Sequence, residues 1–506
     1  MKKTTIKKSK SAFPKLRFLG KHPVVVLFAF CAVFSVYSQE SETAEKPVPA
    51  AEDQRLTIIR YGTDTEIANL IKTLRAEQTG PESRDVLSEV NSAEPPEELP
   101  EEMSPEDPID RELAVLAGKT KNKNILTGVF SFFADRKKEG LEERAVRAIE
   151  ERDDEAFETV SAAIDYMGRI ESPLASEILM EILNGEESRF MNASIRALGK
   201  IAKNAGPEKT AEFLVDYYTN REPGDENRRE IIIALGSTGS KKGTPFLASI
   251  AENNDERVPL RMSALEGLSA IGDEEGLPAV LAAAASGDPN VRAAAIAALG
   301  PFAGETADTA ILEAFRDSYY RTRIAAAQAS RDRKLEEAVP YLKFRCENDE
   351  VPNVRDEAVK ALGAIGNTEA RGILESLFTE RKNSDRIRVG SAEMLLKNDA
   401  PDYVKKVIDE MDYAKSKNQT ALYNGFLRVL GSAKAGDLED LAKRFFSLGG
   451  VIEKSYALDM CLNNGFRGLT EQIRALSDPR NGSLAVKSNN ILKKWETAGG
   501  EKSNGE

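Results

Sequence analysis

The sequence predicts an all-α fold, an α–α superhelical solenoid of stacked helix hairpins. Three features that each return once per cycle indicate it: a glycine that closes an apolar stretch, a proline ahead of one apolar run, and an arginine ahead of a second, alanine-rich run. The steps between the closing glycines are mostly about 31 to 37 residues, a period typical of stacked helix pairs. These glycines are Gly168, Gly199, Gly236, Gly272, Gly300, Gly363 and Gly431.

Residues 1–38 are expected to form a secretory signal peptide. Eight Lys/Arg residues and no acid precede an apolar run from Val24 to Tyr37, which is the order of regions in an export signal. The run is short against the ~20 residues that span a bilayer. We therefore expect cleavage and an exported, periplasmic protein, the alternative being an uncleaved inner-membrane anchor. Removing the eight positive residues from a chain of net charge −13 leaves −21.

The next three segments differ in composition. Residues 39–54 form a polar spacer, and residues 55–78 are expected to form an isolated N-terminal helical hairpin that is split at Gly62. Residues 79–120 are expected to be an acidic, proline-rich, disordered linker. Between residues 94 and 110 there are eight acids and no base, and such a stretch has too little apolar surface to offset the entropy of ordering.

A solenoid is expected from residue 121 to 496, followed by a polar tail over 497–506. Proline is favoured in the first turn of a helix because the N–H there has no partner within the helix, so the recurring prolines mark the first helix of each pair. Asp288 is placed to cap a second helix. The recurring prolines are Pro173, Pro207, Pro245, Pro278, Pro340 and Pro401.

The arginines return at intervals of 31 to 33 residues and form a row that we call the arginine ladder: Arg228, Arg261, Arg292, Arg323, Arg355 and Arg388. Each lies about two helical turns before the end of its second helix, so all six share one face. The favoured interpretation is structural. Asp288 lies four residues before Arg292, and charge-assisted pairs of this kind would link successive repeats. The alternative, a row that binds a polyanion, is disfavoured by the net charge.

Three aromatic pairs are candidate interface residues: Tyr217 and Tyr218, Tyr319 and Tyr320, and Phe445 and Phe446. Neighbours on a helix cannot both face the core, so one of each pair could be exposed, and exposed tyrosine is favoured at interfaces. The alternative is partial burial between neighbouring repeats.

Two segments resemble the HEAT repeat, in the short form also called PBS-lyase HEAT-like. They are Asp288-Pro-Asn-Val-Arg-Ala-Ala-Ala-Ile-Ala-Ala-Leu-Gly300 and Pro352-Asn-Val-Arg-Asp-Glu-Ala-Val-Lys-Ala-Leu-Gly363. The resemblance implies a HEAT/armadillo-like superhelix whose second helices line the concave side, in an exported bacterial protein of this family.

The composition argues against catalysis. His22 is the only histidine, and it is lost with the signal, which excludes histidine-based catalysis and histidine metal sites in the mature chain. Cys346 and Cys461 lie about three and a half repeats apart, too far for a disulfide, and are expected to be buried free thiols. No catalytic, cofactor-binding or metal-binding residue is expected, although HEAT-like repeats also occur in bilin lyases.

The resulting prediction is an exported, non-enzymatic protein–protein interaction scaffold without a cofactor. The alternative is a structural component of a cell-envelope assembly, anchored by an uncleaved N-terminal segment. The expected partners are proteins of unknown identity. Nucleic acid is not expected because of the negative charge, and a membrane is expected only if the N-terminal segment is retained.

Overall fold

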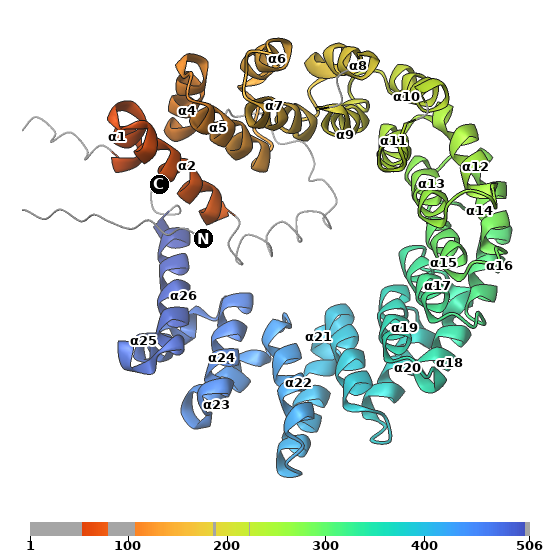
Figure 1. The fold of residues 1–506 in the computed structure, drawn as a ribbon. Coiled ribbons are helices and arrows are strands. Elements are labelled where there is room, and N and C mark those ends of the chain that lie inside the picture. Colours follow the sequence, from red (N-terminus) through yellow and green to blue (C-terminus); the bar gives the residue numbers. More distant parts are fainter. Residues whose placement is uncertain (1–52, 79–106, 186–188, 222, 501–506) are drawn as a thin grey trace, which may run out of the picture. The chain divides into compact units, whose positions relative to one another are not determined.

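The computed structural model describes residues 53–78, 107–185, 189–221 and 223–500, and within these ranges the chain forms helices and no strand (Figure 1). The prediction of an all-α solenoid is confirmed. The signal segment 1–38, most of the polar spacer and residues 79–106 of the linker lie outside the described ranges. None of the described helices combines the length and the apolar composition that crossing a bilayer requires.

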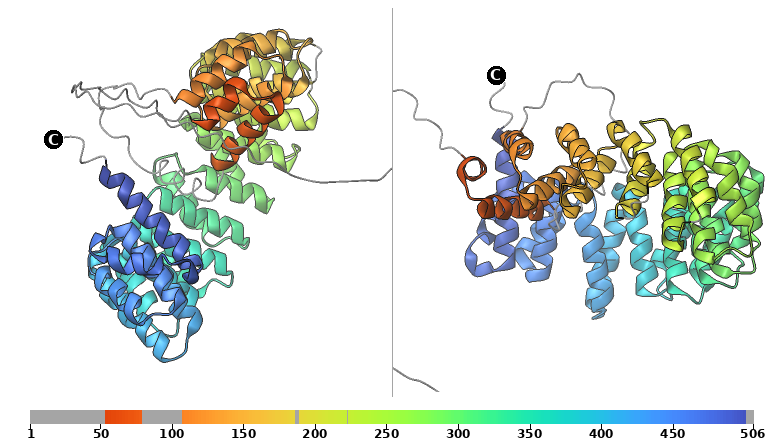
Figure 2. Two further views of the ribbon diagram at one scale, coloured as in Figure 1. Left: turned by 90° about the vertical axis from the view of Figure 1, so that its left-hand side faces the viewer. Right: turned by 45° about the horizontal axis from the view of Figure 1, so that its top comes forward.

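The second helices of the pairs pack each against the next and form one row, which can be followed in Figures 1 and 2. The row consists of α2 (Asp64–Gln78), α5 (Lys123–Asp135), α7 (Phe157–Arg169), α9 (Met191–Ile201), α11 (Asp225–Thr238), α13 (Val258–Ile271), α15 (Pro289–Ala298), α17 (Tyr320–Asp332), α19 (Pro352–Ile365), the first half of α21 (Asp385–Ser416), α22 (Thr420–Ser432), α24 (Val451–Asn464) and α26 (Ser483–Gly500).

The first helices cover the other side of this row. They are α1 (Gln54–Tyr61), α4 (Pro108–Lys119), α6 (Glu142–Glu150), α8 (Ser176–Asn184), α10 (Pro207–Arg221), α12 (Thr244–Glu252), α14 (Leu277–Ala284), α16 (Glu305–Ala314), α18 (Val339–Asn348), α20 (Thr368–Thr379), α23 (Leu438–Leu448) and α25 (Thr470–Leu476). Short 3-10 turns precede several helices: η1 (Pro173–Ala175), η2 (Lys241–Gly243), η3 (Glu274–Gly276), η4 (Glu336–Ala338), η5 (Arg467–Leu469) and η6 (Pro479–Asn481).

Several of the closing glycines allow neighbouring second helices to approach closely. A Cβ added at Gly236 of α11 would lie 2.6 Å from the Cα of Gly267 in α13, and one at Gly199 of α9 would lie 2.8 Å from the Cα of Ala234 in α11. Real Cβ atoms do not come so near to backbone. At these two positions the Leu-Gly pattern is therefore a contact between repeats, with leucine in the core and glycine at the helix crossing.

The structure differs from the prediction that residues 55–78 form an isolated hairpin. Ile67, Ile71 and Leu74 of α2 are buried in the same core cluster as Leu113 and Ile125. The α1–α2 pair is thus the first pair of the stack, because its apolar face packs on the next pair. Two polar contacts across this boundary accompany the packing: Arg60 Nη2 lies 2.7 Å from Glu112 Oε1, and Asn122 donates to Asp64 at 2.8 Å.

The described chain also differs from a linker that reaches residue 120, because α4 occupies Pro108–Lys119. Asp107 caps this helix by accepting from the backbone N–H of Ile109 at 2.9 Å, and Pro108 occupies its first turn. Asp110 belongs by composition to the acidic run, yet its carboxylate is buried and paired with Arg136 and Lys138 after α5. The prediction from composition therefore assigned Asp110 to the linker, whereas its carboxylate forms ion pairs within the helical stack.

The two halves of α21 belong to different rows. Asp399 inside α21 has non-helical angles (φ −154°, ψ 68°), and Pro401 follows this kink. The sequence indicates a first helix beginning at Pro401, and the second half of α21 is that helix. At the other end of the stack, α26 reaches Gly500, so the first residues of the predicted polar tail 497–506 are helical.

Candidate functional site

Every arginine of the ladder is the fourth residue of its helix, as the first residues of α11, α13, α15, α17, α19 and α21 show. Two of them hold the next repeat with a bidentate fork. Arg292 donates to the two carboxylate oxygens of Asp317 at 2.8 and 3.0 Å, and Arg323 donates to those of Asp349 at 2.7 and 2.9 Å. Such paired, parallel hydrogen bonds fix geometry and are strong.

The same guanidinium groups also close the turn of their own repeat. Arg292 donates to the carbonyls of Ser286 and Gly287 at 3.0 and 3.2 Å. The expected pair with Asp288 is not present, because Asp288 instead accepts from the backbone N–H groups of Asn290 and Val291 and caps α15. The arginine therefore joins two repeats across the next turn, and the aspartate four residues before it serves the helix start.

The partner carboxylates are perturbed by this arrangement. Burial raises the pKa of Asp349, but the hydrogen bonds from Arg323 and from the Val351 N–H lower it by more. The pKa of Asp349 therefore lies below its usual range. The pKa of Asp317 is lowered in the same way by Arg292 and the Tyr319 N–H, against burial. Both groups are charged and satisfied within the stack.

Three of the remaining ladder arginines are also occupied. Arg228 donates to Tyr218 at 2.7 Å and to Glu256 at 2.6 Å, while Arg261 donates to the Ala251 carbonyl at 3.0 Å. Arg388 donates to the Phe378 carbonyl at 2.9 Å and to Glu410 at 2.6 Å. The guanidinium groups of these three arginines are hydrogen-bonded within the protein. Few donors of the arginine ladder therefore remain to bind a polyanion.

Arg355 is the exception. Within the described ranges its side chain makes no hydrogen bond or ion pair, and it is half-buried. The carboxylate that stands 25 residues after it is Glu380, the spacing at which Asp317 follows Arg292. Glu380 is bound to Lys382 at 2.7 Å and to Ser376 at 2.7 Å instead.

The candidate interface aromatics are all at least partly buried. Tyr217 and Phe445 are in the core, and Tyr218 and Phe446 pack against it. Tyr319 and Tyr320 are half-buried, and the Tyr319 hydroxyl hydrogen-bonds Asn290 of the preceding repeat at 2.9 Å. Tyr217 and Tyr319 thus contact the preceding repeat, and none of the six side chains is fully exposed.

Other apolar side chains are exposed. Leu448, the last residue of α23, is 84% exposed, and Val451 and Ile452, the first two residues of α24, are exposed as well. In the sequence, these exposed apolar residues flank a pair of glycines, Gly449 and Gly450, which indicates a turn between two helices. Apolar residues at helix ends are common in the core of such a stack, so the sequence did not distinguish these three as exposed.

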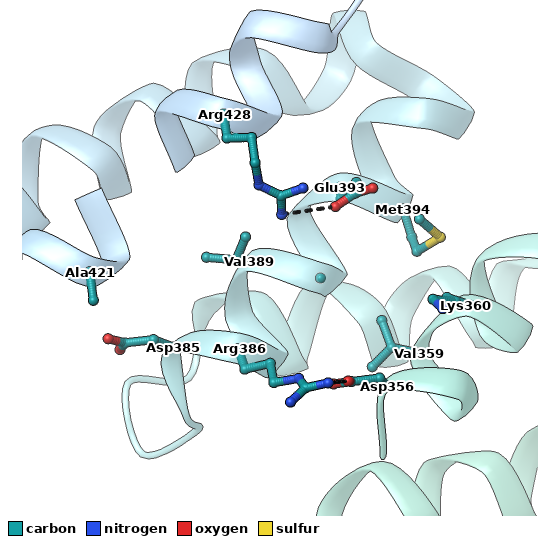
Figure 3. A pocket seen from close by; sticks show the side chains of 11 residues that line it. Asp356, Val359, Lys360, Asp385, Arg386, Val389, Glu393, Met394, Ala421 and Arg428 are labelled. Atoms are coloured by element: carbon teal, nitrogen blue, oxygen red, sulfur yellow. Dashed lines mark hydrogen bonds and ion pairs between the residues drawn. The ribbon is translucent and has the colours of Figure 1, made fainter. Parts of the chain in front are cut away.

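The row of second helices carries a cavity of about 330 Å³ between α19, α21 and α22 (Figure 3). Its floor is apolar and includes Val359, Val389 and Met394. Around the floor lie charged side chains from all three helices. None of these residues belongs to the arginine ladder or to the aromatic pairs, so the sequence analysis did not identify this site.

Two ion pairs frame the cavity. Arg386 of α21 pairs with Asp356 of α19, and Arg428 of α22 pairs with Glu393 of α21 at 3.4 Å; Figure 3 shows both. Each pair joins consecutive second helices, so the frame also links repeats. Both guanidinium groups are exposed, which is the setting in which an ion pair adds little stability and keeps spare donors for a ligand.

Further cavities lie along the same row. One, of about 450 Å³, lies between α13, α15 and α17 over Ala293, Ala294 and Ala297. Another, of about 400 Å³, lies between α2, α5 and α7 and is lined by polar groups that include Lys72 and Lys123. Several openings along one row of helices are typical of a surface that contacts an extended ligand at many points.

The described residues contain no group of three or more His, Cys, Asp or Glu side chains arranged to hold a metal ion. Cys346 and Cys461 are both buried and not bonded to each other. Burial raises the pKa of the Cys461 thiol to about 12 and that of Cys346 further still. Thiols with such pKa values are weak nucleophiles near neutral pH.

Comparison with known proteins gives a family. The model of a family described as spirochaete HEAT repeat protein matches residues 101–491. Among solved structures, yeast importin-beta (Kap95p) is similar with a TM-score of 0.46 and 10% identity, covering 88% of this chain and 65% of that chain.

A second similar structure is karyopherin Kap121p bound to the extreme C-terminus of the protein phosphatase Cdc14p, with a TM-score of 0.42, 12% identity and coverage of 87% of this chain. The chain spans only 53% of that karyopherin. The complex of CpcE and CpcF of phycocyanin lyase from Nostoc is also similar, with a TM-score of 0.30, 21% identity and 44% of this chain covered. No curated protein matches the chain.

Proposed function

The chain belongs to the family of spirochaete HEAT repeat proteins, and from this we propose that it is an exported, non-enzymatic scaffold that binds protein partners on its row of second helices. The observation that carries the proposal is the cavity between α19, α21 and α22, which combines an apolar floor with charged groups at its rim. This combination suits side chains and backbone of a protein ligand.

The proposed compartment is the periplasm. The basic segment and the apolar run within residues 1–38 support export. After cleavage the protein has a net charge of −21, which repels nucleic acid and favours neutral or basic protein partners.

Site-specific crosslinking in the native compartment tests the scaffold proposal. A photo-crosslinking residue at Ala421, an exposed position in the cavity lining, is expected to give a discrete protein adduct. The matched control is Ala282, an exposed alanine of α14 in the row of first helices. Equal adducts from both positions, or none from Ala421, would contradict a partner surface on the second helices.

The alternative is a structural component of a cell-envelope assembly that is anchored by an uncleaved N-terminus, and the apolar run Val24–Tyr37 is the observation in its favour. Fractionation separates the two. Release of the protein by osmotic shock, with an N-terminus beginning after residue 38, supports the soluble scaffold. Pelleting with membranes and an intact N-terminus supports the anchored component.

A further inference from the structure

We propose that the cavity between α19, α21 and α22 binds an extended segment of the partner protein through one aliphatic residue, flanked by one basic and one acidic residue. This rests on the proposed function, since it assumes a protein partner on this row. Four features of the cavity lead to this proposal: the small residues that line it, its apolar floor, its charged rim and the opposite charges at its two ends.

Two small residues, Gly390 of α21 and Ala421 of α22, line the cavity and leave space in it. Two residues after the ladder arginine, the preceding three repeats carry Ala294, Ala325 and Glu357, whereas α21 carries Gly390. A Cβ at Gly390 would meet only Val359 Cγ1 at 3.6 Å, so there is room above it. Across the cavity, α22 presents Ala421, an exposed residue.

The floor selects an aliphatic group of modest size. Val359, Val389 and Met394 line it, and methionine adapts its shape to different side chains. The volume of about 330 Å³ lies at the lower end of the range for small-ligand sites. It accommodates one side chain with its adjoining backbone and is too small for a helix.

The rim favours an extended backbone. Each framing ion pair has exposed atoms: the side chains of Arg386 and Arg428 are both 60% exposed. Spare guanidinium donors and carboxylate lone pairs match the C=O and N–H groups of an extended segment. A helix uses those groups internally, so it would gain nothing from this rim.

The two ends carry opposite charges. Asp385, the first residue of α21, is exposed and has no ion-pair partner among the described residues. Lys360 of α19 is 56% exposed and lies 3.3 Å from Glu357, which leaves it free donors toward solvent. Figure 3 places Asp385 and Lys360 on opposite sides of the cavity. Charge complementarity therefore calls for a basic ligand residue near Asp385 and an acidic one near Lys360.

The test uses the full mature chain and immobilised synthetic peptides of Gly and Ser around a central Lys-Ser-Leu-Ser-Glu. Replacing the central Leu by Ser is expected to weaken binding about tenfold, the value of one buried aliphatic side chain. Peptides with two Glu or two Lys flanks are expected to bind about two- to fivefold more weakly, because each loses one favourable charge contact.

Gly390→Leu fills the cavity and is expected to weaken binding of the Lys-Ser-Leu-Ser-Glu peptide about tenfold. Leucine is a better helix former than glycine, so the variant should fold at least as well. Gly372→Leu is the matched control, since Gly372 lies within α20 with open space around it. Asp385→Lys should reverse the charge preference and favour the peptide with two Glu flanks.

Unchanged binding in Gly390→Leu, or equal binding of all the peptides, overturns the proposed ligand class. A crosslinked partner through Ala421 in that case leaves the scaffold proposal standing. Absence of any crosslink together with peptide binding that depends on Gly390 supports the ligand class and contradicts the scaffold in its native compartment.

Discussion

At the scale of single residues, the arginine ladder joins neighbouring repeats. Arg323 and Asp349 show this most clearly, since both are buried and joined by two hydrogen bonds. The carboxylate comes from the turn of the next repeat, not from the turn that precedes the arginine. Arg292 and Arg323 each reach both their own turn and the following one, which fits their spacing of 31 residues.

Removing a ladder arginine is expected to lower the free energy of unfolding, and the loss should be larger where a buried carboxylate loses its partner. Arg323→Ala leaves a buried carboxylate and should reduce the free energy of unfolding by about 2–4 kcal/mol. Arg292→Ala should cost about 1–3 kcal/mol, with partner affinity per folded molecule unchanged. Chemical denaturation measures both. Arg355→Ala is the control, and with no partner to lose it should change stability by less than about 0.5 kcal/mol.

An Arg292→Ala variant that lost partner binding with unchanged melting temperature would contradict the structural role. So would an Arg355→Ala variant as unstable as Arg323→Ala.

Glu453 at the start of α24 predicts a stability change at acid pH. Burial raises its pKa, but hydrogen bonds from Lys415, from backbone and from Tyr423 lower it to about 2. Because the folded pKa lies below the unfolded value of 4.5, the stabilisation is present above pH 4.5 and is lost as pH falls toward 2. Glu453→Gln should reduce the loss of unfolding free energy in this window. An unchanged pH slope would contradict the assignment.

At the scale of elements, the crossing of consecutive second helices depends on glycine. Gly236 lies against Gly267 so closely that no Cβ fits between α11 and α13. This is a requirement of packing between helices, because Gly236 lies within the helix and not at its end. The turn glycines have a separate function: Gly272, with φ 63°, ends α13 in the left-handed region.

Gly236→Ala is therefore expected to destabilise the protein by about 1–3 kcal/mol, the cost of overpacking, although alanine is the better helix former. The control is Gly372→Ala in α20, where nothing lies within 4 Å of the added Cβ; it should stabilise by about 0.5–1 kcal/mol. Thermal unfolding of the two variants measures both changes in stability. A stabilised Gly236→Ala would show that the helices can separate without cost.

Capping decides element boundaries that composition hides. The start of α4 has the sequence Asp107-Pro108, a cap and a first-turn proline, inside a run of acids and prolines. Its buried residues Ile109, Leu113 and Ala117 repeat at helical spacing. The element was therefore predictable from these residues, but the count of acids and prolines over the whole segment outweighed them.

At the scale of the whole molecule, each helix pair packs on the pairs before and after it, so stability is carried by neighbouring repeats. The core cluster nevertheless continues from Ile59 in α1 to Ile491 in α26. The first pair, α1 and α2, depends on α4 and α5 alone for this packing, which makes it the natural place for local opening.

Ile71→Ala removes a buried side chain beside Gly128 of α5, where an added Cβ would lie 3.1 Å from Ile71 Cγ2. It is expected to speed amide hydrogen exchange in α1, α2 and α4 while leaving exchange in α22 to α26 unchanged, because the effect passes only between neighbours. Mass spectrometry of exchanged peptides gives the comparison. Uniformly faster exchange along the stack would indicate a single cooperative unit.

The sequence by itself determined the solenoid. Its glycines, prolines and arginines recur because each helix pair packs on the next in a similar way, so the pattern predicts the fold. The buried thiols of Cys346 and Cys461 also followed from spacing.

Tertiary structure alone decided the rest: that Arg292 binds Asp317 rather than Asp288, that the α1–α2 pair joins the stack, and that the six aromatic side chains are at least partly buried. It also placed the cavity that Gly390 and Ala421 line. These features depend on residues that meet across repeats, about thirty positions apart in the chain, and a pattern within one repeat does not contain them.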